Sequence, residues 1–123
     1  MKALVVDDSL TIRRIVINAL NLVGIHEATE AGDGVEAVKA VQAGAFDLIL
    51  LDWNMPKMSG IEALRAIRRG GHKTPVIMVT TEAEKSRVIE AIKSGANDYL
   101  IKPFSPDQLA AKVKNIIGAA SPA

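Results

Sequence analysis

Five short aliphatic segments alternate along the chain with five longer stretches in which apolar residues recur every three or four positions. The short segments are continuous runs rather than an alternation of apolar and polar residues, which is typical of strands covered on both faces. The longer stretches have the spacing of helices with one buried face. The predicted strands cover residues 3–6, 25–29, 46–51, 75–79 and 99–101.

Residues that favour helix ends lie between these segments. The candidate helix caps are Ser9, Asp33, Ser59 and Ser105 or Asp107. The helices are expected to stop near Gly24, Gly44, Gly70 and Gly95. This strict alternation of strand and helix predicts an α/β fold, in which helices cover both faces of one parallel sheet and the crossovers are right-handed.

The length of 123 residues is that of one domain. We expect a single domain over residues 1–123, with its core at about 2–118 and a loose tail at 119–123. Hydrophobic residues make up 49% of the chain and aromatic residues only 3%, so the core must be aliphatic. Two arginine pairs, Arg13-Arg14 and Arg68-Arg69, are expected on solvated helix faces.

The charge and the missing cysteine exclude several classes of protein. Fifteen Lys and Arg residues against fourteen Asp and Glu residues give a net charge of +1, which is not the basic excess of a nucleic-acid-binding protein. The absence of Cys excludes disulfides and thiolate metal sites and fits a reducing cytoplasm. No apolar run approaches the 18 or so residues of a transmembrane helix, so no membrane partner is expected.

Polar residues follow four of the five predicted strands. Asp7 and Asp8 come after the first strand, Asp52 after the third, Thr80 after the fourth and Lys102 after the fifth. Functional sites of open α/β sheets lie at the carboxyl ends of the strands, so these side chains are expected to converge there. Each residue alone has an ordinary structural explanation, such as a helix cap or a turn, but together they favour a functional site.

Three carboxylates in one crevice repel each other unless one is protonated or a cation neutralises them. With no Cys and only two His in the chain, the ligands would all be oxygen atoms, which suits Mg²⁺, Mn²⁺ or Ca²⁺. Lys102 adds a positive charge and Thr80 a hydroxyl donor. A carboxylate nucleophile, a hard cation, an ammonium group and a hydroxyl together indicate phosphoryl transfer.

Four motifs carry a resemblance to a known family: Val5-Val6-Asp7-Asp8-Ser9, the segment 52–60 that begins Asp52-Trp53-Asn54, the pair Val79-Thr80, and the segment 98–104 that contains Tyr99 and Lys102-Pro103. The chain resembles the receiver domain of two-component response regulators, in particular the single-domain chemotaxis regulators. The resemblance spans residues 2 to about 118. It implies a doubly wound (βα)5 domain whose five parallel strands have the flavodoxin-like order 2-1-3-4-5.

The resemblance also implies a role for each site residue. Asp52 would be the phosphoacceptor, which takes its phosphoryl group from a phosphohistidine of a partner kinase. Asp8, Asp52 and the backbone carbonyl of Asn54 would bind Mg²⁺, for which Mn²⁺ could substitute, and Asp7 would act through a coordinated water. The chain would then be a signalling phosphoprotein rather than an enzyme in the usual sense.

Three further residues would respond to the phosphoryl group. Lys102 would pair with its oxygens, Thr80 would move to hydrogen-bond it, and Tyr99 would swing inward behind Thr80. The Lys102-Pro103 peptide bond would be cis, as only X–Pro bonds commonly are. Residues Thr81, Asn54 and Glu82 flank the pocket; position 81 is often Ala in the family, and Asn54 and Glu82 occupy positions that tune dephosphorylation there.

The partners that the resemblance implies are a chemotaxis histidine kinase, a flagellar motor switch protein or other target, and a phosphatase. The target would bind a monomer on the face made by the fourth helix, the fifth strand and the fifth helix.

Other functions are alternatives to this one. A close alternative is a phosphorelay intermediate, which would pass its phosphoryl group to another histidine protein. A phosphatase of the haloacid dehalogenase type is less favoured, because it would need two Asp residues separated by one residue after the first strand. Here Asp7 and Asp8 are adjacent. An FMN carrier is disfavoured because these acids would repel its phosphate.

Overall fold

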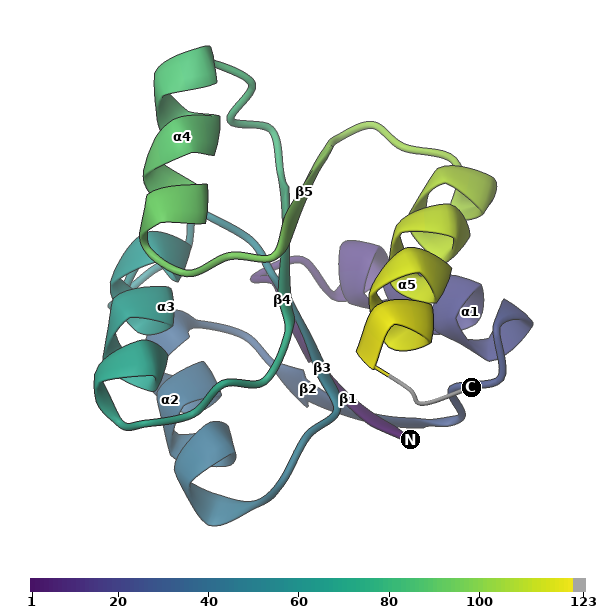
Figure 1. Cartoon of the computed structure of the whole chain (residues 1–123), viewed down its shortest axis with the longest axis horizontal. Helices are drawn as coiled ribbons and strands as arrows, with labels where there is room; N and C mark the ends of the chain where they lie inside the picture. Colours follow the sequence, from purple (N-terminus) through teal and green to yellow (C-terminus); the bar gives the residue numbers. More distant parts are fainter. Residues whose placement is uncertain (121–123) are drawn as a thin grey trace.

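The structure is a computed structural model, and it describes residues 1–120. Five strands form one parallel sheet in the order β2-β1-β3-β4-β5, and each strand is followed by a helix (Figure 1). This confirms the predicted fold and strand order. The elements are β1 (Lys2–Val6), α1 (Leu10–Leu22), β2 (Glu27–Ala31), α2 (Gly34–Ala43), β3 (Leu48–Leu51), α3 (Gly60–Arg69), β4 (Val76–Thr80), α4 (Lys85–Lys93), β5 (Asp98–Ile101) and α5 (Pro106–Ala120).

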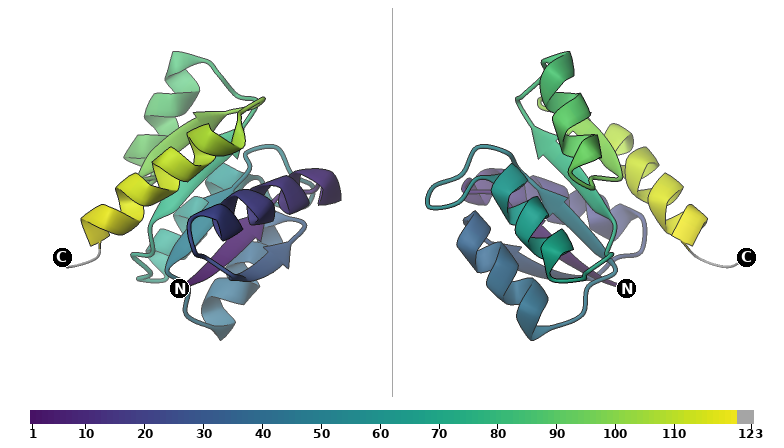
Figure 2. Two further views of the ribbon diagram at one scale, coloured as in Figure 1. Left: turned by 90° about the vertical axis from the view of Figure 1, so that its right-hand side faces the viewer. Right: turned by 60° about the vertical axis from the view of Figure 1, so that its left-hand side comes forward.

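Helices cover both faces of the sheet. Figures 1 and 2 show α1 and α5 side by side on one face and α2, α3 and α4 on the other. Alternate residues of each strand supply two separate cores, because successive side chains of a strand point to opposite faces. In β1, Leu4 and Val6 pack under α2 and α3, whereas Ala3 and Val5 pack under α1 and α5. Both cores are mainly aliphatic, as the composition predicts.

The predicted helix caps are largely confirmed. The side chains of Ser9, Asp33 and Ser59 each accept a hydrogen bond from the backbone in the first turn of a helix. At the start of α5, Ser105 rather than Asp107 is the cap, because its hydroxyl accepts from the backbone N–H of Gln108. Helix α5 continues through Ala120, so the first two residues of the expected loose tail are helical, and residues 121–123 lie outside the described residues.

The second strand begins two residues later than the sequence predicts. The backbone N–H of Ile25 donates to the carbonyl of Leu20, and Gly24 takes a positive φ of 85°, so Ile25 closes the end of α1 instead of entering the sheet. Strand β2 lies at the sheet edge and reads Glu-Ala-Thr-Glu-Ala, so its own sequence has little of the aliphatic signal. Ile25 is nevertheless fully buried against the core.

Two arginines that were expected in solvent are structural. Arg68 donates to the backbone carbonyls of His72, Thr74 and Gly95, and thereby ties α3 to the loops that precede β4 and β5. The side chain of Arg13 is only 17% exposed. The prediction of solvated faces is therefore wrong for these two residues, whereas Arg14 and Arg69 are exposed. Within residues 1–120, every helix is too short or too polar to cross a membrane.

Candidate functional site

The register of the sheet brings the predicted site residues together at the carboxyl ends of the strands. Val6 pairs with Leu51, so Asp7 and Asp52 are the next residues on two neighbouring strands. Thr80 pairs with Ile101, so Lys102 follows at the same edge. The backbone N–H of Asp52 still donates to Val6, and that of Lys102 to Thr80. The site is thus a direct continuation of the hydrogen-bonded sheet.

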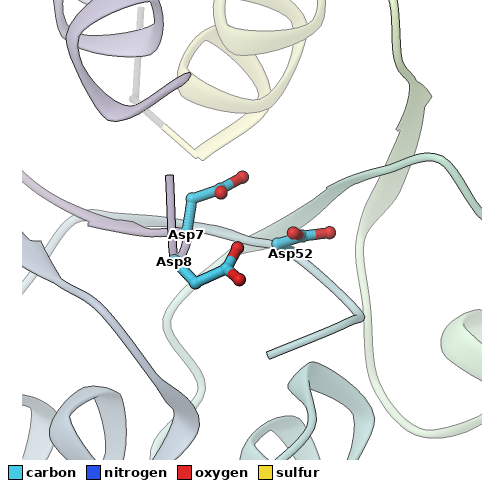
Figure 3. Close-up of side chains that lie close together, drawn as sticks. All are labelled: Asp7, Asp8 and Asp52. Atoms are coloured by element: carbon cyan, nitrogen blue, oxygen red, sulfur yellow. The ribbon is translucent and has the colours of Figure 1, made fainter. Parts of the chain in front are cut away.

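Asp7, Asp8 and Asp52 form a carboxylate cluster. Each offers an oxygen, and these oxygens all lie within 4.8 Å of one another. Figure 3 shows the three side chains next to each other at the ends of their strands. Asp7 and Asp52 are buried, whereas Asp8 is exposed. An all-oxygen cluster that is open on one side fits a hard divalent cation that keeps water ligands.

Lys102 lies between the two buried carboxylates. Its Nζ is 2.7 Å from Oδ2 of Asp7 and 3.3 Å from Oδ2 of Asp52. The other oxygen of each carboxylate accepts a backbone N–H: Oδ1 of Asp52 from Trp53 at 2.7 Å, and Oδ1 of Asp7 from Ser9 at 2.9 Å. Both carboxylates are therefore fixed in orientation by one backbone group and one shared ammonium group.

Burial raises the pKa of Asp52, and the nearby charge of Asp7 raises it further. Lys102, the Thr80 hydroxyl and the Trp53 amide act in the opposite direction without cancelling the shift. Burial alone would lower the pKa of Lys102, but the hydrogen bond to Asp7 and the charges of Asp7 and Asp52 leave it raised. The ammonium group is therefore charged at neutral pH, whereas the Asp52 carboxylate carries an energetic cost that a cation would relieve.

Thr80 and Tyr99 meet at Glu82. Thr80 is fully buried, and its Oγ1 accepts from the backbone N–H of Glu82 at 3.3 Å. The Tyr99 hydroxyl donates to the backbone carbonyl of Glu82 at 2.6 Å. Burial and the charge of Glu82 raise the pKa of Tyr99 to about 12. The two predicted switch residues therefore bind the same short segment that leads from β4 into α4.

The two flanking residues are joined across the surface. Nδ2 of Asn54 donates to Oε1 of Glu82 at 3.1 Å, a contact exposed to solvent. Next to it, Trp53 is 5% exposed and Cζ of Arg87 lies 5.4 Å from the centre of its ring. The loop that follows β3 is therefore linked to the loop after β4 through Glu82 and to α4 through Arg87.

The loop after β3 depends on a close backbone approach. The N–H of Gly60 donates to the carbonyl of Trp53 at 2.8 Å, and a Cβ at position 60 would collide with the carbonyl of Asp52. Ser59 and Glu62 then form a capping box that begins α3. Lys57 has a φ of 67°, a conformation that a residue with a side chain adopts at some cost. The expected cis bond at Lys102-Pro103 is present.

Sequence reasoning missed three contributors to the site. Nη1 of Arg13 donates to the backbone carbonyl of Asp7 at 2.7 Å. Arg87 lies over Trp53, and Gly60 makes room for the backbone of Asp52. Only Gly60 carried a signal, since it directly follows the candidate cap Ser59.

Comparison with known proteins gives a consistent picture. Residues 3–114 match the family described as the response regulator receiver domain. Chemotaxis protein CheY1 of Helicobacter pylori is 44% identical over 121 residues, which cover 96% of this chain and 98% of the relative. Chemotaxis protein CheY of Pseudomonas aeruginosa is 44% identical over 118 residues, with coverages of 94% and 95%.

Solved structures agree with these relatives. The receiver domain of the Francisella response regulator 1452 superposes with a TM-score of 0.90 at 36% identity and covers 98% of both chains. Chemotaxis response regulator CheY4 of Vibrio cholerae superposes with a TM-score of 0.86 at 38% identity, covering 94% of this chain and 97% of that one.

Proposed function

The chain belongs to the response regulator receiver family, and from this premise we propose that Asp52 accepts a phosphoryl group from a phosphohistidine of a histidine kinase. The observation that carries the proposal is the position of Lys102, whose ammonium group lies between Asp7 and Asp52 at the carboxylate cluster. A carboxylate nucleophile with a fixed ammonium group and a set of oxygen ligands beside it suits phosphoryl transfer. The proposal includes a monomeric, cytoplasmic protein with one receiver domain over residues 1–123.

In the proposed reaction, a carboxylate oxygen of Asp52 attacks the phosphorus atom. The bond between phosphorus and the histidine nitrogen of the kinase breaks, and its electron pair stays on the imidazole. Lys102 is positioned to pair with the phosphoryl oxygens. Thr80, fully buried beside Asp52, supplies a hydroxyl donor for the phosphoryl group. Catalysis by these groups consists of positioning and charge neutralisation rather than proton transfer.

The carboxylate cluster supports a bound divalent cation. Asp8, Asp52 and the backbone carbonyl of Asn54 would hold Mg²⁺ or Mn²⁺, with Asp7 acting through a water molecule. When bound, the cation supplies positive charge that offsets the carboxylates and the phosphoryl oxygens. The exposed position of Asp8 and the burial of Asp7 and Asp52 are consistent with a site that keeps solvent-facing ligands.

Phosphorylation would reach the surface through the segment that begins at Thr80. If Thr80 turns to the phosphoryl group, its contact with the Glu82 backbone is lost, and Glu82 also holds the Tyr99 hydroxyl. The face of α4, β5 and α5 carries exposed Ile89, Ile92 and Ile101, which suits a protein target. From the chemotaxis relatives we infer that the target is a flagellar motor switch protein and that a dedicated phosphatase ends the signal.

The test is phosphotransfer from a phosphorylated chemotaxis histidine kinase, or from acetyl phosphate, in millimolar Mg²⁺. We expect one labile phosphate per chain, located at Asp52 by mass spectrometry after borohydride reduces the acyl phosphate to homoserine. Asp52→Asn should take up none, whereas Asp107→Asn, an exposed carboxylate on α5, should be labelled like the parent. Full labelling of Asp52→Asn would overturn the assignment of the phosphoacceptor.

A further inference from the structure

An apolar pocket of about 220 Å³ opens beside the carboxylate cluster. It lies between α1, the loop after β4 and the loop after β5. Among the described residues, none of the three clustered carboxylates lines it. Its lining residues are Ile12, Ile15, Thr81, Lys102, Pro103 and Phe104.

Two lining residues connect the pocket to the phosphorylation site. Lys102 contributes to the wall of the pocket, and its Nζ lies 3.3 Å from Oδ2 of Asp52. Thr81 directly follows Thr80, the proposed hydroxyl donor to the phosphoryl group. A ligand in the pocket would therefore be next to the place where a phosphoryl group is transferred.

The lining selects the chemistry of that ligand. Four of the residues are aliphatic, aromatic or proline side chains, and the charged one is a lysine. The volume is smaller than that of pockets for drug-sized ligands, which begin at about 300 Å³. Apolar cavities of about 150 Å³ already bind molecules of the size of benzene. The pocket thus suits a short apolar group attached to an anion.

We propose that the pocket binds the acyl chain of a small acyl phosphate and makes four-carbon acyl phosphates better phosphodonors than acetyl phosphate. The inference rests on the proposed function, because the donor reacts at Asp52. An Asp52 carboxylate oxygen forms a bond to phosphorus, and the bond between phosphorus and the acyl oxygen breaks. The electron pair leaves with the carboxylate product, so the step is balanced without a proton or a redox partner.

The apolar rim could also contact a protein partner, since Ile15 is 39% exposed. The small volume favours the acyl chain as the occupant, because a protein segment needs a longer groove. The experiment below separates these occupants.

The first measurement compares the second-order rate constants of labelling by acetyl phosphate and butyryl phosphate in millimolar Mg²⁺, followed by intact mass. Each methylene that enters an apolar site favours binding about fourfold. We therefore expect butyryl phosphate to react roughly three- to fifteen-fold faster, since the open pocket buries the added methylenes only in part. Equal rate constants for the two donors would overturn the proposal.

Matched variants on α1 locate the effect. Ile15→Phe fills the pocket and should bring the ratio of the two rate constants close to one. Leu22→Phe adds the same side chain at a position that is 70% exposed on the same helix, and should leave the ratio at the parental value. An unchanged ratio in Ile15→Phe would place the preference elsewhere and contradict the proposal.

A binding measurement without metal or reaction completes the test. Butylphosphonate, which cannot transfer its phosphoryl group, should shift the methyl resonances of Ile12 and Ile15 but not that of Ile61 on the opposite face. Shifts with no labelling of Asp52 would mean that the proposed function fails while the pocket assignment holds. Labelling of Asp52 without these shifts and without a donor preference would mean that the proposed function holds and the pocket assignment fails. The apolar rim would then be assigned to a protein partner.

Discussion

The ammonium group of Lys102 lies closer to Asp7, at 2.7 Å, than to the proposed phosphoacceptor Asp52, at 3.3 Å. Asp7 therefore makes the shorter of the two contacts that hold the lysine in place. Asp52 is oriented by the Trp53 amide on one oxygen and by the longer contact to Lys102 on the other, so the positive charge that a phosphoryl group needs is already beside it.

Removing this ammonium group should lower the stability of the protein and make target binding independent of phosphorylation. Lys102→Ala leaves two buried carboxylates without their cation, so the free energy of unfolding in metal-free buffer should fall by about 1–3 kcal/mol. Denaturant melts measure this. Lys112→Ala is the control, because its partner Asp98 and its own side chain are partly exposed, and it should cost less than about 1 kcal/mol.

The same variant tests coupling. Lys102→Ala should still take up some phosphate from acetyl phosphate, since Asp52 and the carboxylate cluster remain. Its binding to the target should no longer depend on phosphorylation or on beryllofluoride. Normal phosphate-dependent binding, measured in a pull-down with and without beryllofluoride, would contradict the role of Lys102.

Neutralising Asp52, the proposed phosphoacceptor, should stabilise the metal-free protein. Burial and Asp7 raise the pKa of Asp52, so keeping this carboxyl ionised costs stability once the pH exceeds the ordinary carboxyl pKa. Stability of the parent should therefore decline as pH rises from about 4, the ordinary carboxyl pKa, through the raised value. Asp52→Asn should be more stable at neutral pH by on the order of 1 kcal/mol. Lower stability of the variant in metal-free buffer would refute this.

Divalent cation binding should be visible in the fluorescence of Trp53, the only Trp in the chain, because its backbone N–H binds Asp52. We expect a saturable change at millimolar Mg²⁺. Asp8→Asn, which removes the exposed carboxylate of the cluster, should shift the midpoint to higher Mg²⁺. An unchanged signal in the parent protein would count against a metal site here.

Tyr99 is the only Tyr in the chain, so its ionisation can be followed by absorbance. Its pKa should be about 12, because the ring is buried and Glu82 is nearby. The unfolded chain ionises near 10, so stability should fall as pH rises from about 10 to about 12. Tyr99→Phe should remove this decline, and Arg87→Gln should raise the pKa further, since Arg87 lowers it. A midpoint near 10 in the folded protein would show that Tyr99 is solvated.

A methyl group at position 60 should disturb the loop that carries Asp52. The added Cβ of Gly60→Ala would collide with the Asp52 carbonyl, so unfolding should become easier by about 3 kcal/mol. Gly118→Ala is the matched control, because its Cβ meets nothing and it lies within α5, where alanine is favoured by about 0.5–1 kcal/mol. Thermal melts should therefore shift in opposite directions for the two variants.

The sequence predicts the fold class because continuous aliphatic runs and amphipathic stretches differ in period. It also predicts which edge carries the site, since Asp7, Asp52, Thr80 and Lys102 each stand at or directly after a strand end. The strand order follows from the family resemblance alone, because the residues of a hydrophobic run do not indicate which strands lie beside it in the sheet. The second strand was misplaced because a buried Ile25 imitates a strand residue next to an edge strand that is mostly polar.

Contacts to backbone atoms were the least predictable. Arg68 and Arg13 were expected in solvent, yet they bind carbonyl groups of loops that the sequence pattern does not bring near them. The family resemblance predicts that Asn54 and Glu82 lie beside the carboxylate cluster. Their mutual hydrogen bond was not predictable, because it depends on how two loops approach each other in space. Side-chain type alone carries no information on such approaches.

Asp7 and Lys102 are separated by 95 positions, and their side chains meet across β3 and β4, which lie between their strands in the finished sheet. During synthesis on the ribosome, the first two-thirds of the chain can bring Asp7, Asp8 and Asp52 together but cannot supply their counter-charge. A nascent or truncated chain would lack the Lys102 ammonium group at this acidic centre, so the proposed receipt of a phosphoryl group would await translation of β5 and the residue after it.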